Sequence, residues 1–528
     1  MVARRLSTET PSRAALIPLF FAGKSVFITG ATGFMGKVLV ERLLATCPDI
    51  GRLFLLMREK KDVSPEKRLL QLKSSQVFDV LREKNPSQLD KLVLVPGDVE
   101  LPDLGMSAAT IESLYEVRIV FHSAATLKFD EALGKAVDQN VRSVITLMDV
   151  CDRLPNIQAF VHVSTAYSNA DLDEVEERVY PPPVELERLL TLVDTVPADL
   201  LAEITPKYIA PKPNTYCFTK AMAETAVERH GCKHYPIAIF RPTIVISSHR
   251  NPFPGWIENL NGPSGVVVGA GKGLLHVFSC RDQFHADLLP VDIAIDALIA
   301  VAWETAVDQR SEVRVYNCST SENPTRWCEF IDSLRRAVWK YPLDSALWYP
   351  SGTTFQNKYA MKAHELLLQT VPLHLAEYAA RLFGLKPQLS LITVSHRLKM
   401  MNEVLTFFAL HEWKFSTDRF RLLRNRLTPA DSALYNLDPN TIHWDSHFEM
   451  FVKGTRKYLL KERDQDIEKA QRHLKRMFYL HTALKLLACT TFLRLVLRNQ
   501  FARSFVFGTL RLLLSLFVTL YSRVRQHL

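Results

Sequence analysis

The sequence predicts an α/β fold in which a doubly wound parallel sheet comes first, followed by an α-helical C-terminal domain and a basic hydrophobic tail. The first observation is the apolar, β-prone run 26–28, bounded by glycines, which is typical of a strand buried on both faces. The second is a glycine-rich turn after that strand. The third is the helical spacing of Val38, Leu39, Leu43 and Leu44 beyond the turn. Four later apolar runs are typical of further strands: 52–57, 92–95, 119–121 and 159–163.

The turn after the first strand has the spacing of a dinucleotide-binding fingerprint, Gly30-x-x-Gly33-x-x-Gly36. Gly30 permits the tight turn, Gly33 lets the backbone approach a pyrophosphate, and Gly36 lets the helix pack close to the strand. The helix N-terminus favours the charge of the pyrophosphate. The alternative is an ordinary glycine-rich turn. We expect the cofactor contacts of this stretch to be Thr29, Gly30, Thr32, Gly33, Phe34, Met35 and Gly36.

Length and composition narrow the class of protein. A chain of 528 residues exceeds one ordinary core, so at least two domains are expected. Hydrophobic residues make up 47% and charged residues 23%, which is typical of a globular protein. The eight cysteines form no CxxC pair and no Cys/His cluster with metal-ligand spacing, so we expect free thiols, a reducing compartment and no metal. No secretory signal is expected at the N-terminus.

The residue after the second predicted strand bears on the choice of cofactor. Proteins that bind NAD usually carry an acid there, which holds the ribose 2′-hydroxyl. This chain has Arg58 after Met57. A guanidinium suits a 2′-phosphate, so the sequence favours NADPH. A solvated surface arginine is the alternative.

Small and polar residues follow the later strands, at the sheet edge where such folds bind their ligands. Asp98 lies where a side chain could meet the adenine edge, although a plain turn aspartate fits nearly as well. His122 ends the fourth strand and is expected to be structural, and the small residues after it leave room for a ribose. The expected cofactor contacts here are Asp98, Val99, Ser123, Ala124 and Ala125.

Tyr216 and Lys220 lie four residues apart in a stretch with helical spacing, which places them on one face. A tyrosine has a pKa of about 10 and is a weak proton donor near neutrality, but a neighbouring ammonium stabilises the phenolate and lowers that pKa. The fifth strand ends at Ser164 and Thr165, whose hydroxyls could orient a carbonyl beside the phenol. Tyr-x-x-x-Lys alone is common on surface helices. After a glycine fingerprint and a strand ending in Ser-Thr, it is a strong signal.

Together these residues resemble the extended short-chain dehydrogenase/reductase family, with its Rossmann-type sheet. Further stretches are similar to the alcohol-forming fatty acyl-CoA reductases, and the resemblance covers about Phe20 to Leu460. It implies that family's helical C-terminal domain. The stretches that carry it are PFPGWIENLNGP at 252–263, Asn214-Thr215-Tyr216, Pro372-Leu373-His374, 383–387, Trp413-Lys414-Phe415 and Trp444.

The resemblance implies a role for each matching residue. Tyr216 would donate a proton to the substrate oxygen. Lys220 would lower the pKa of Tyr216 and hold the nicotinamide ribose. Thr165 or Ser164 would bind the carbonyl oxygen, and the register between the two stays open. Asn140, on an otherwise apolar helix face, would support Lys220 through a water and count among the cofactor contacts.

Two further positions follow from the resemblance. The loop Arg241-Pro242-Thr243 would face the nicotinamide, with Pro242 and Thr243 as cofactor contacts. Asp292 matches a helix-cap position and is expected to be structural.

The implied reaction takes a long-chain fatty acyl-CoA to a primary alcohol through an aldehyde, with two NADPH used in turn and coenzyme A released. Coenzyme A already activates the acyl group, so no cysteine nucleophile is needed and Cys217 is expected to be a small filler. The rivals are an aldehyde-forming reductase, another extended-family carbonyl oxidoreductase, and a membrane scaffold without activity. The intact Tyr216, Lys220 and glycine turn weigh against the scaffold.

The expected domains are a poorly structured lead-in at 1–22, which could pack on the first domain, a catalytic domain at 23–342, a linker at 343–357, a helical domain at 358–460 and a tail at 461–528. The helical domain is either a simple cap or the cover of an acyl-chain tunnel. A cover would shield an alkyl chain that loses roughly 0.8 kcal/mol for each CH2 left in water, but the periodicity of the sequence does not separate the two alternatives.

The tail indicates a membrane. The net charge of +9 is uneven, because Glu468 is the last acidic residue. Arginines interleaved with aliphatic runs favour a membrane surface over nucleic acid. We expect a charged helix at 456–476, then either one span or a two-helix hairpin in one leaflet from Leu484–Leu497 and Ser504–Tyr521. The expected location is the endoplasmic reticulum or the peroxisome, with the catalytic domain in the cytosol. The oligomeric state stays open.

Overall fold

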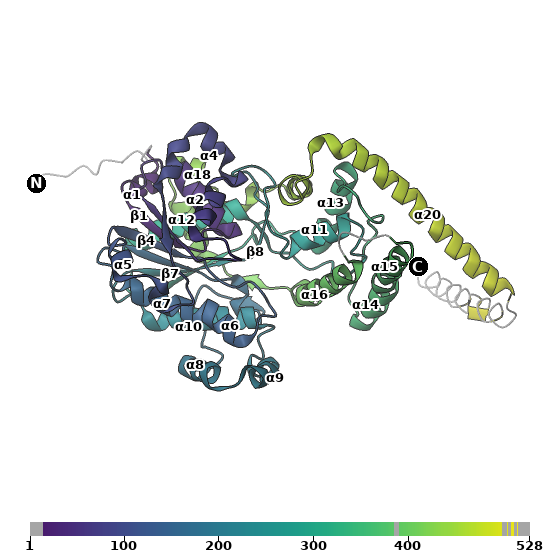
Figure 1. Ribbon diagram of the computed structural model, residues 1–528, viewed down its shortest axis with the longest axis horizontal. Coiled ribbons are helices and arrows are strands. Elements are labelled where there is room, and N and C mark those ends of the chain that lie inside the picture. Colours follow the sequence, from purple (N-terminus) through teal and green to yellow (C-terminus); the bar gives the residue numbers. More distant parts are fainter. Residues whose placement is uncertain are drawn as a thin grey trace, which may run out of the picture.

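The computed structural model describes residues 14–384 and 390–498, together with 504, 508, 509, 511 and 515. Within these residues a sheet flanked by helices forms one half of the molecule, and a helical region forms the other. A single long helix, α20 (Ile467–Arg498), runs along the outside of the helical region (Figure 1).

Seven strands of the described chain form one sheet, in the order β11-β7-β5-β4-β1-β2-β3. Every neighbouring pair is parallel. The strand order reverses between β1 and β4, and ligands of such sheets bind at the carboxyl ends beside that point. The predicted doubly wound α/β fold is therefore confirmed. The strands are β1 Ser25–Thr29, β2 Leu53–Met57, β3 Leu92–Pro96, β4 Val117–His122, β5 Ala159–Val163, β7 Ile237–Pro242 and β11 Arg314–Cys318.

Strand β1 shows how the sheet is covered on both faces. Val26 and Ile28 belong to one hydrophobic core and Phe27 to the other, because successive side chains of a strand point to opposite faces. Helices α2 (Phe34–Thr46) and α12 (Val291–Asp308) fill the first core, while α7 (Ser143–Cys151) and α10 (Thr215–His230) fill the second (Figure 1).

Shorter elements fill the connections between these strands and helices. A small strand pair, β8 and β10, extends the sheet region toward the helical half. The elements are α3 Pro65–Lys73, α4 Asp79–Lys84, α5 Ala108–Glu112, α6 Leu133–Val137, β6 Glu174–Val175, α8 Leu186–Thr195, α9 Ala198–Tyr208, β8 Ile244–Ile246, α11 Pro263–Gly271, β9 Val277–Ser279 and β10 Leu288–Pro290.

The predicted lead-in and the predicted linker both pack on the rest of the protein where the structure describes them. Residues 14–22 contain α1 (Leu16–Phe21), whose Ile17 and Phe21 are fully buried in the first core. Residues 343–357 contain β12 (Thr353–Phe355), which pairs with β9, and Leu343 is 1% exposed. These side chains pack against residues that are far away in the sequence. Local composition therefore does not predict their burial.

The helical region returns to the sheet before it ends. Strand β13 (Lys414–Phe415) pairs with β6, and Tyr435, Leu437 and Ile442 are buried in the first core. The C-terminal block is therefore integrated with the catalytic half. Its helices are α13 Trp327–Lys340, α14 Lys358–Glu365, α15 Val371–Leu382, α16 Leu391–Leu410, α17 Asp418–Arg426, α18 Pro429–Leu434 and α19 Trp444–Gly454.

The tail differs from the expected charged helix at 456–476. The chain breaks after a π-helical turn at Thr455–Leu459, and α20 begins at Ile467. Arg456 is 1% exposed, and its charge is compensated by ion pairs with Asp344 and Glu462. Among the described residues, one helical stretch, Asp464–Arg498, is long and apolar enough to cross a membrane, and its apolar window is not buried. Most of the expected second apolar segment lies outside the described residues.

Candidate active site

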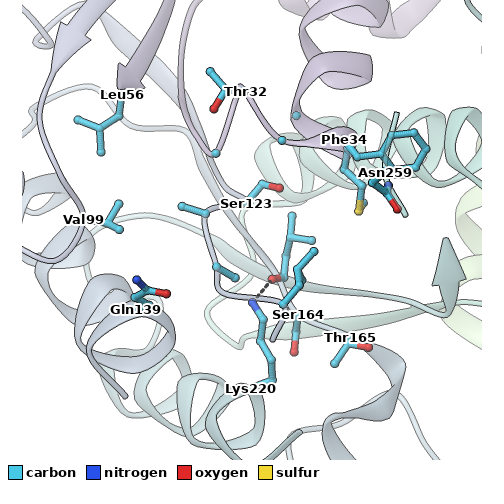
Figure 2. A pocket seen from close by; sticks show the side chains of 18 of the residues that line it. Thr32, Phe34, Leu56, Val99, Ser123, Gln139, Ser164, Thr165, Lys220 and Asn259 are labelled. Atoms are coloured by element: carbon cyan, nitrogen blue, oxygen red, sulfur yellow. Dashed lines mark hydrogen bonds between the residues drawn. The ribbon is translucent and has the colours of Figure 1, made fainter. Parts of the chain in front are cut away.

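A cleft of about 550 Å³ lies at the carboxyl ends of the central strands. It gathers residues that the sequence predicts from several separate stretches (Figure 2). The glycine turn and the start of α2 contribute Gly30, Thr32, Gly33, Phe34, Met35 and Gly36. The other predicted residues in the lining are Arg58, Asp98, Val99, Ser123, Ala124, Ala125, Ser164, Thr165, Tyr216, Lys220, Pro242 and Thr243.

The glycine turn has the geometry that its spacing predicts. Gly30 has φ of 76°, and a Cβ there would lie 2.7 Å from the Ala124 nitrogen. A Cβ on Gly36 would lie 2.2 Å from the Gly30 oxygen, so α2 packs directly on the turn. At Gly33 the sole described atom within 4 Å of such a Cβ is the Gly30 oxygen, at 3.2 Å. A side chain at Gly33 would therefore occupy the cleft, where a pyrophosphate fits.

Thr29 and Asn140, predicted as cofactor contacts, do not belong to the cleft lining. Thr29 is fully buried, and its hydroxyl bonds His122 Nδ1 at 2.8 Å and accepts from the Ala124 amide at 3.2 Å. Thr29 thus ties the end of β1 to the end of β4. Burial lowers the pKa of His122 to about 3, so this ring is a neutral structural group, as expected.

Asn140 lies in a π-helical turn, Asp138–Arg142, between α6 and α7. Such turns are frequent at functional sites. Its side-chain amide donates to the Thr219 hydroxyl at 2.9 Å, and its oxygen accepts from the Thr126 amide at 2.9 Å. Asn140 therefore joins the loop after β4 to α10 from behind the cleft.

Tyr216 stands in the first turn of α10, which Asn214 caps by accepting from the Cys217 amide at 2.8 Å. Burial raises the pKa of the Tyr216 phenol above its ordinary value, and a hydrogen bond with Thr165 opposes the shift. The sequence predicts the opposite direction through Lys220. The desolvation of a buried phenolate outweighs the bond to Thr165, and Lys220 is directed elsewhere.

Lys220 is buried, and its ammonium donates to the Val163 carbonyl at 2.8 Å, as Figure 2 shows. Burial lowers the pKa of Lys220 to about 8, and the nearby Glu224 carboxylate opposes this shift. The lysine is therefore mostly protonated at neutral pH. It is held by the end of β5, one helical turn from Tyr216.

The structure separates the two candidate hydroxyls of β5. Ser164 donates to Glu224, which also holds Arg241 through an ion pair of 2.6 Å. Thr165 instead lines the cleft beside Tyr216, and its hydroxyl accepts from the Tyr167 amide at 3.3 Å. Arg241 is fully buried and does not line the cleft, whereas Pro242 and Thr243 of the same loop do. Its guanidinium is committed to Glu224 and to backbone carbonyls.

One end of the cleft is lined by more cationic side chains than the sequence predicts. Arg58 is paired with Asp98 at 3.1 Å and with Glu100 at 3.0 Å, and Lys60 and Arg68 also line the cleft. Burial and repulsion by Arg58 lower the pKa of Arg68. Arg68 lies in α3, and no sequence pattern predicts that this helix lies beside the end of β2.

The loop at 252–262 forms one wall of the cleft mouth. Phe34 stacks on Trp256 with ring centroids 5.1 Å apart, and Glu258 forms an ion pair with Lys37. Asn259 lies beside Phe34 in Figure 2. The family resemblance rests partly on this stretch but implies no role for its residues.

A second, apolar cavity of about 430 Å³ adjoins the cleft. Both share Thr165, Tyr216 and Thr243. One wall of the apolar cavity is α16, which contributes Met400, Met401, Val404, Leu405 and Phe408. The phenol therefore lies where a polar cleft meets a hydrocarbon-lined space.

Cys217, next to the phenol in sequence, is a buried thiol. Burial raises the pKa of Cys217 to about 12, so its thiol stays protonated and serves as the expected filler. Within 14–384 and 390–498, no group of three or more His, Cys, Asp or Glu side chains could hold a metal ion. The arrangement suits proton donation to a carbonyl oxygen bound between Thr165 and Tyr216.

Comparison with known proteins identifies the family and the fold of this chain. The two parts of the chain match family models described as male sterility protein, over residues 28–298 and 368–462. Two reductase domains share the fold, both with a TM-score of 0.54. One is the terminal R domain of the myxalamid PKS-NRPS pathway, at 16% identity over 84% of this chain and 92% of that chain. The other is the R domain of a Mycobacterium tuberculosis nonribosomal peptide synthetase, at 19% identity over 83% and 94%.

Curated relatives are much closer in sequence. Fatty acyl-CoA reductase 1 of Rattus norvegicus is 36% identical over 92% of this chain and 95% of its own length. Fatty acyl-CoA reductase 2 of Bos taurus is 35% identical over 93% of this chain and 95% of its own length. With such identity over nearly the whole length, the chain belongs to the fatty acyl-CoA reductase family.

Proposed function

We propose that this protein reduces long-chain fatty acyl-CoA to a primary fatty alcohol with NADPH and releases coenzyme A. The observation that carries the proposal is the position of Tyr216 and Thr165, which line both the cleft and the apolar cavity. The names of the curated relatives support the acyl-CoA class of substrate.

The residues of the cleft fit a nicotinamide dinucleotide phosphate. The open space before Gly33 and the N-terminus of α2 suit a pyrophosphate. Arg68, with hydroxyl and carbonyl partners but no carboxylate partner among the described residues, suits the additional 2′-phosphate. When bound, such a cofactor supplies hydride to a carbonyl carbon.

The chain's own residues handle the oxygen. Thr165 and Tyr216 bind the carbonyl oxygen, and Tyr216 donates its proton as negative charge develops there. Burial keeps the phenol protonated before reaction, so a proton is present to give. The ammonium of Lys220, one helical turn from Tyr216, donates to the Val163 carbonyl, and it stabilises the phenolate that remains through its positive charge and not through a hydrogen bond in this structure. The thioester and the aldehyde each place charge on the same oxygen, so one site serves both steps.

The experiment is an incubation of the purified full chain in detergent with acyl-CoA of several lengths and NADPH, followed by extraction and identification of the products. Fatty alcohol and free coenzyme A are expected. Aldehyde as the final product would favour the aldehyde-forming alternative. Failure to oxidise NADPH with any acyl-CoA would favour the scaffold without activity.

Replacing Arg68 by methionine is expected to raise the KM for NADPH about tenfold or more and to leave the KM for NADH nearly unchanged. A hydrogen bond to a charged group contributes roughly 1.5–3 kcal/mol, and NADH lacks the phosphate. Steady-state kinetics with both cofactors measures this difference. Arg52→Met is the control, because Arg52 is 65% exposed and pairs with Glu116 away from the cleft. An equal loss for both cofactors would remove Arg68 from this role.

We propose that α20 attaches the protein to an intracellular membrane, the endoplasmic reticulum or the peroxisome, with the catalytic half in the cytosol. Support comes from its exposed apolar stretch and from the eight cysteines, which all lie in the described ranges as free thiols. A chain ending after Thr482 keeps the packed part of α20, including Leu474 and His481. It is expected to leave the membrane fraction and to remain active. Full-length protein that floats free of membranes would contradict the proposal.

A further inference from the structure

A third cavity, of about 510 Å³, is lined by Val266, Val267 and Ala270 of α11 and does not contain Tyr216, and we call it the distal cavity. Helix α13, strands β9 and β12 and helix α20 also contribute to its walls. In Figure 1, α11 and α13 lie between the sheet and α20. The apolar part of the lining includes Val266, Val267, Ala270, Leu275, Phe278, Leu334, Val338 and Leu474.

The distal cavity and the apolar cavity share two residues, Val266 and Phe278. These two side chains therefore stand between the spaces, one from α11 and one from β9. Both are 8% exposed and carry no polar atoms. A chain that passes from one cavity to the other meets hydrocarbon at this point.

The glycines of α11 let this helix pack closely against α16. A Cβ on Gly265 would lie 2.8 Å from the Met401 sulfur, and one on Gly269 would lie 3.2 Å from a Leu398 methyl. α11 and α16 are thus in direct contact along this face, which leaves little room between them. The way past α11 lies at Val266 and Phe278.

The distal cavity reaches the surface beside α20. Leu474 of that helix is 1% exposed and lines the cavity. Lys485, further along the same helix, also lines it. Arg335, which is 55% exposed, is a second cation in its lining. Beyond this point α20 exposes Leu486, Leu487 and further large apolar residues. The mouth of the cavity therefore adjoins the stretch suited to a membrane.

We propose that the distal cavity is a second subsite for the alkyl chain, which takes the methyl end of a long fatty acyl substrate and of its product. This inference rests on the proposed function. An unbranched hydrocarbon fits the path because it has no polar group to desolvate between Val266 and Phe278, and burial of each methylene is favourable. A short acyl chain ends within the apolar cavity and does not reach the distal one.

The first test fills the distal cavity with the substitution Ala270→Phe and measures kcat/KM for stearoyl-CoA and octanoyl-CoA in the full chain. The ratio of the two is expected to fall about tenfold, which corresponds to the loss of about two buried methylenes. The control is Val268→Phe on the same helix. Val268 is outside the linings of these three cavities in the described chain, so the ratio should stay at the parent value.

The second test needs no variant. Parent protein is irradiated with a stearoyl-CoA analogue that carries a diazirine at its methyl end, and the labelled peptides are identified by mass spectrometry. Label is expected on α13, at Leu334 or Val338, and an octanoyl analogue is expected to label α16, at Met401 or Phe408.

The outcomes separate this inference from the proposed function. Parent protein that turns over no acyl-CoA would remove the proposed function itself. An active parent whose chain-length ratio is unchanged by Ala270→Phe, or whose stearoyl label falls on α16 alone, would overturn the distal subsite and leave the reduction standing.

Discussion

Replacing Tyr216 by phenylalanine is expected to lower the rate of acyl-CoA reduction about 10²–10⁴-fold, the usual contribution of a positioned general acid. The substitution removes the hydroxyl that lines the cleft beside Thr165 and keeps the ring, which packs edge-to-face on Phe129 with ring centroids 5.3 Å apart. NADPH binding should persist, because the glycine turn and Arg68 are untouched. NADPH oxidation measures the rate, and calorimetric titration measures binding.

Tyr208→Phe is the matched control for that substitution. Tyr208 lies in α9 and contacts Phe218, and it belongs to neither the cleft nor the apolar cavity among the described residues. Its loss should leave the rate near the parent value. Full activity of the Tyr216 variant would instead remove the phenol from the reaction and with it the proposed assignment.

Replacing Glu224 by leucine is expected to lower the free energy of unfolding by about 3–5 kcal/mol, the usual cost of breaking a buried ion pair on one side. Glu224 is 1% exposed and Arg241 is fully buried, so the guanidinium would lose its carboxylate with no access to water. Ser164 and Ser168 would lose an acceptor as well. Chemical denaturation followed by circular dichroism measures the change.

The double variant Glu224→Leu with Arg241→Met tests the cause. Because both charges are then removed, much of the lost stability should return. A single variant that loses less than about 1 kcal/mol, or a double variant less stable than the single one, would show that the pair does not determine the stability of this core.

Much of the site could be predicted because its signals are local. The glycine turn specifies its own backbone geometry, and the spacing of Tyr216 and Lys220 specifies a shared helix face. The strand ends at Ser123 and Thr165 could be located because apolar runs of parallel strands are easy to recognise. What remained open was the choice between Ser164 and Thr165, since a register of one residue reverses the face.

The rest depends on contacts between distant parts of the chain. Arg68 reaches the cofactor end of the cleft from a separate helix, and Leu343 is buried although its surrounding sequence is polar. The direction of the Tyr216 pKa also could not be predicted, because sequence reports the neighbouring lysine but not the depth of burial. Such quantities follow from packing, which no local pattern encodes.

The return of the chain to the sheet has a consequence for biosynthesis. Tyr435, Leu437 and Ile442 cover an apolar surface formed with α2 and α12, both of which leave the ribosome much earlier. Until residues 420–442 have been translated, the nascent chain exposes that surface, and exposed apolar surface favours aggregation. We therefore expect chaperones to hold the nascent chain at this stage, and the catalytic half to reach its native state only near the end of synthesis.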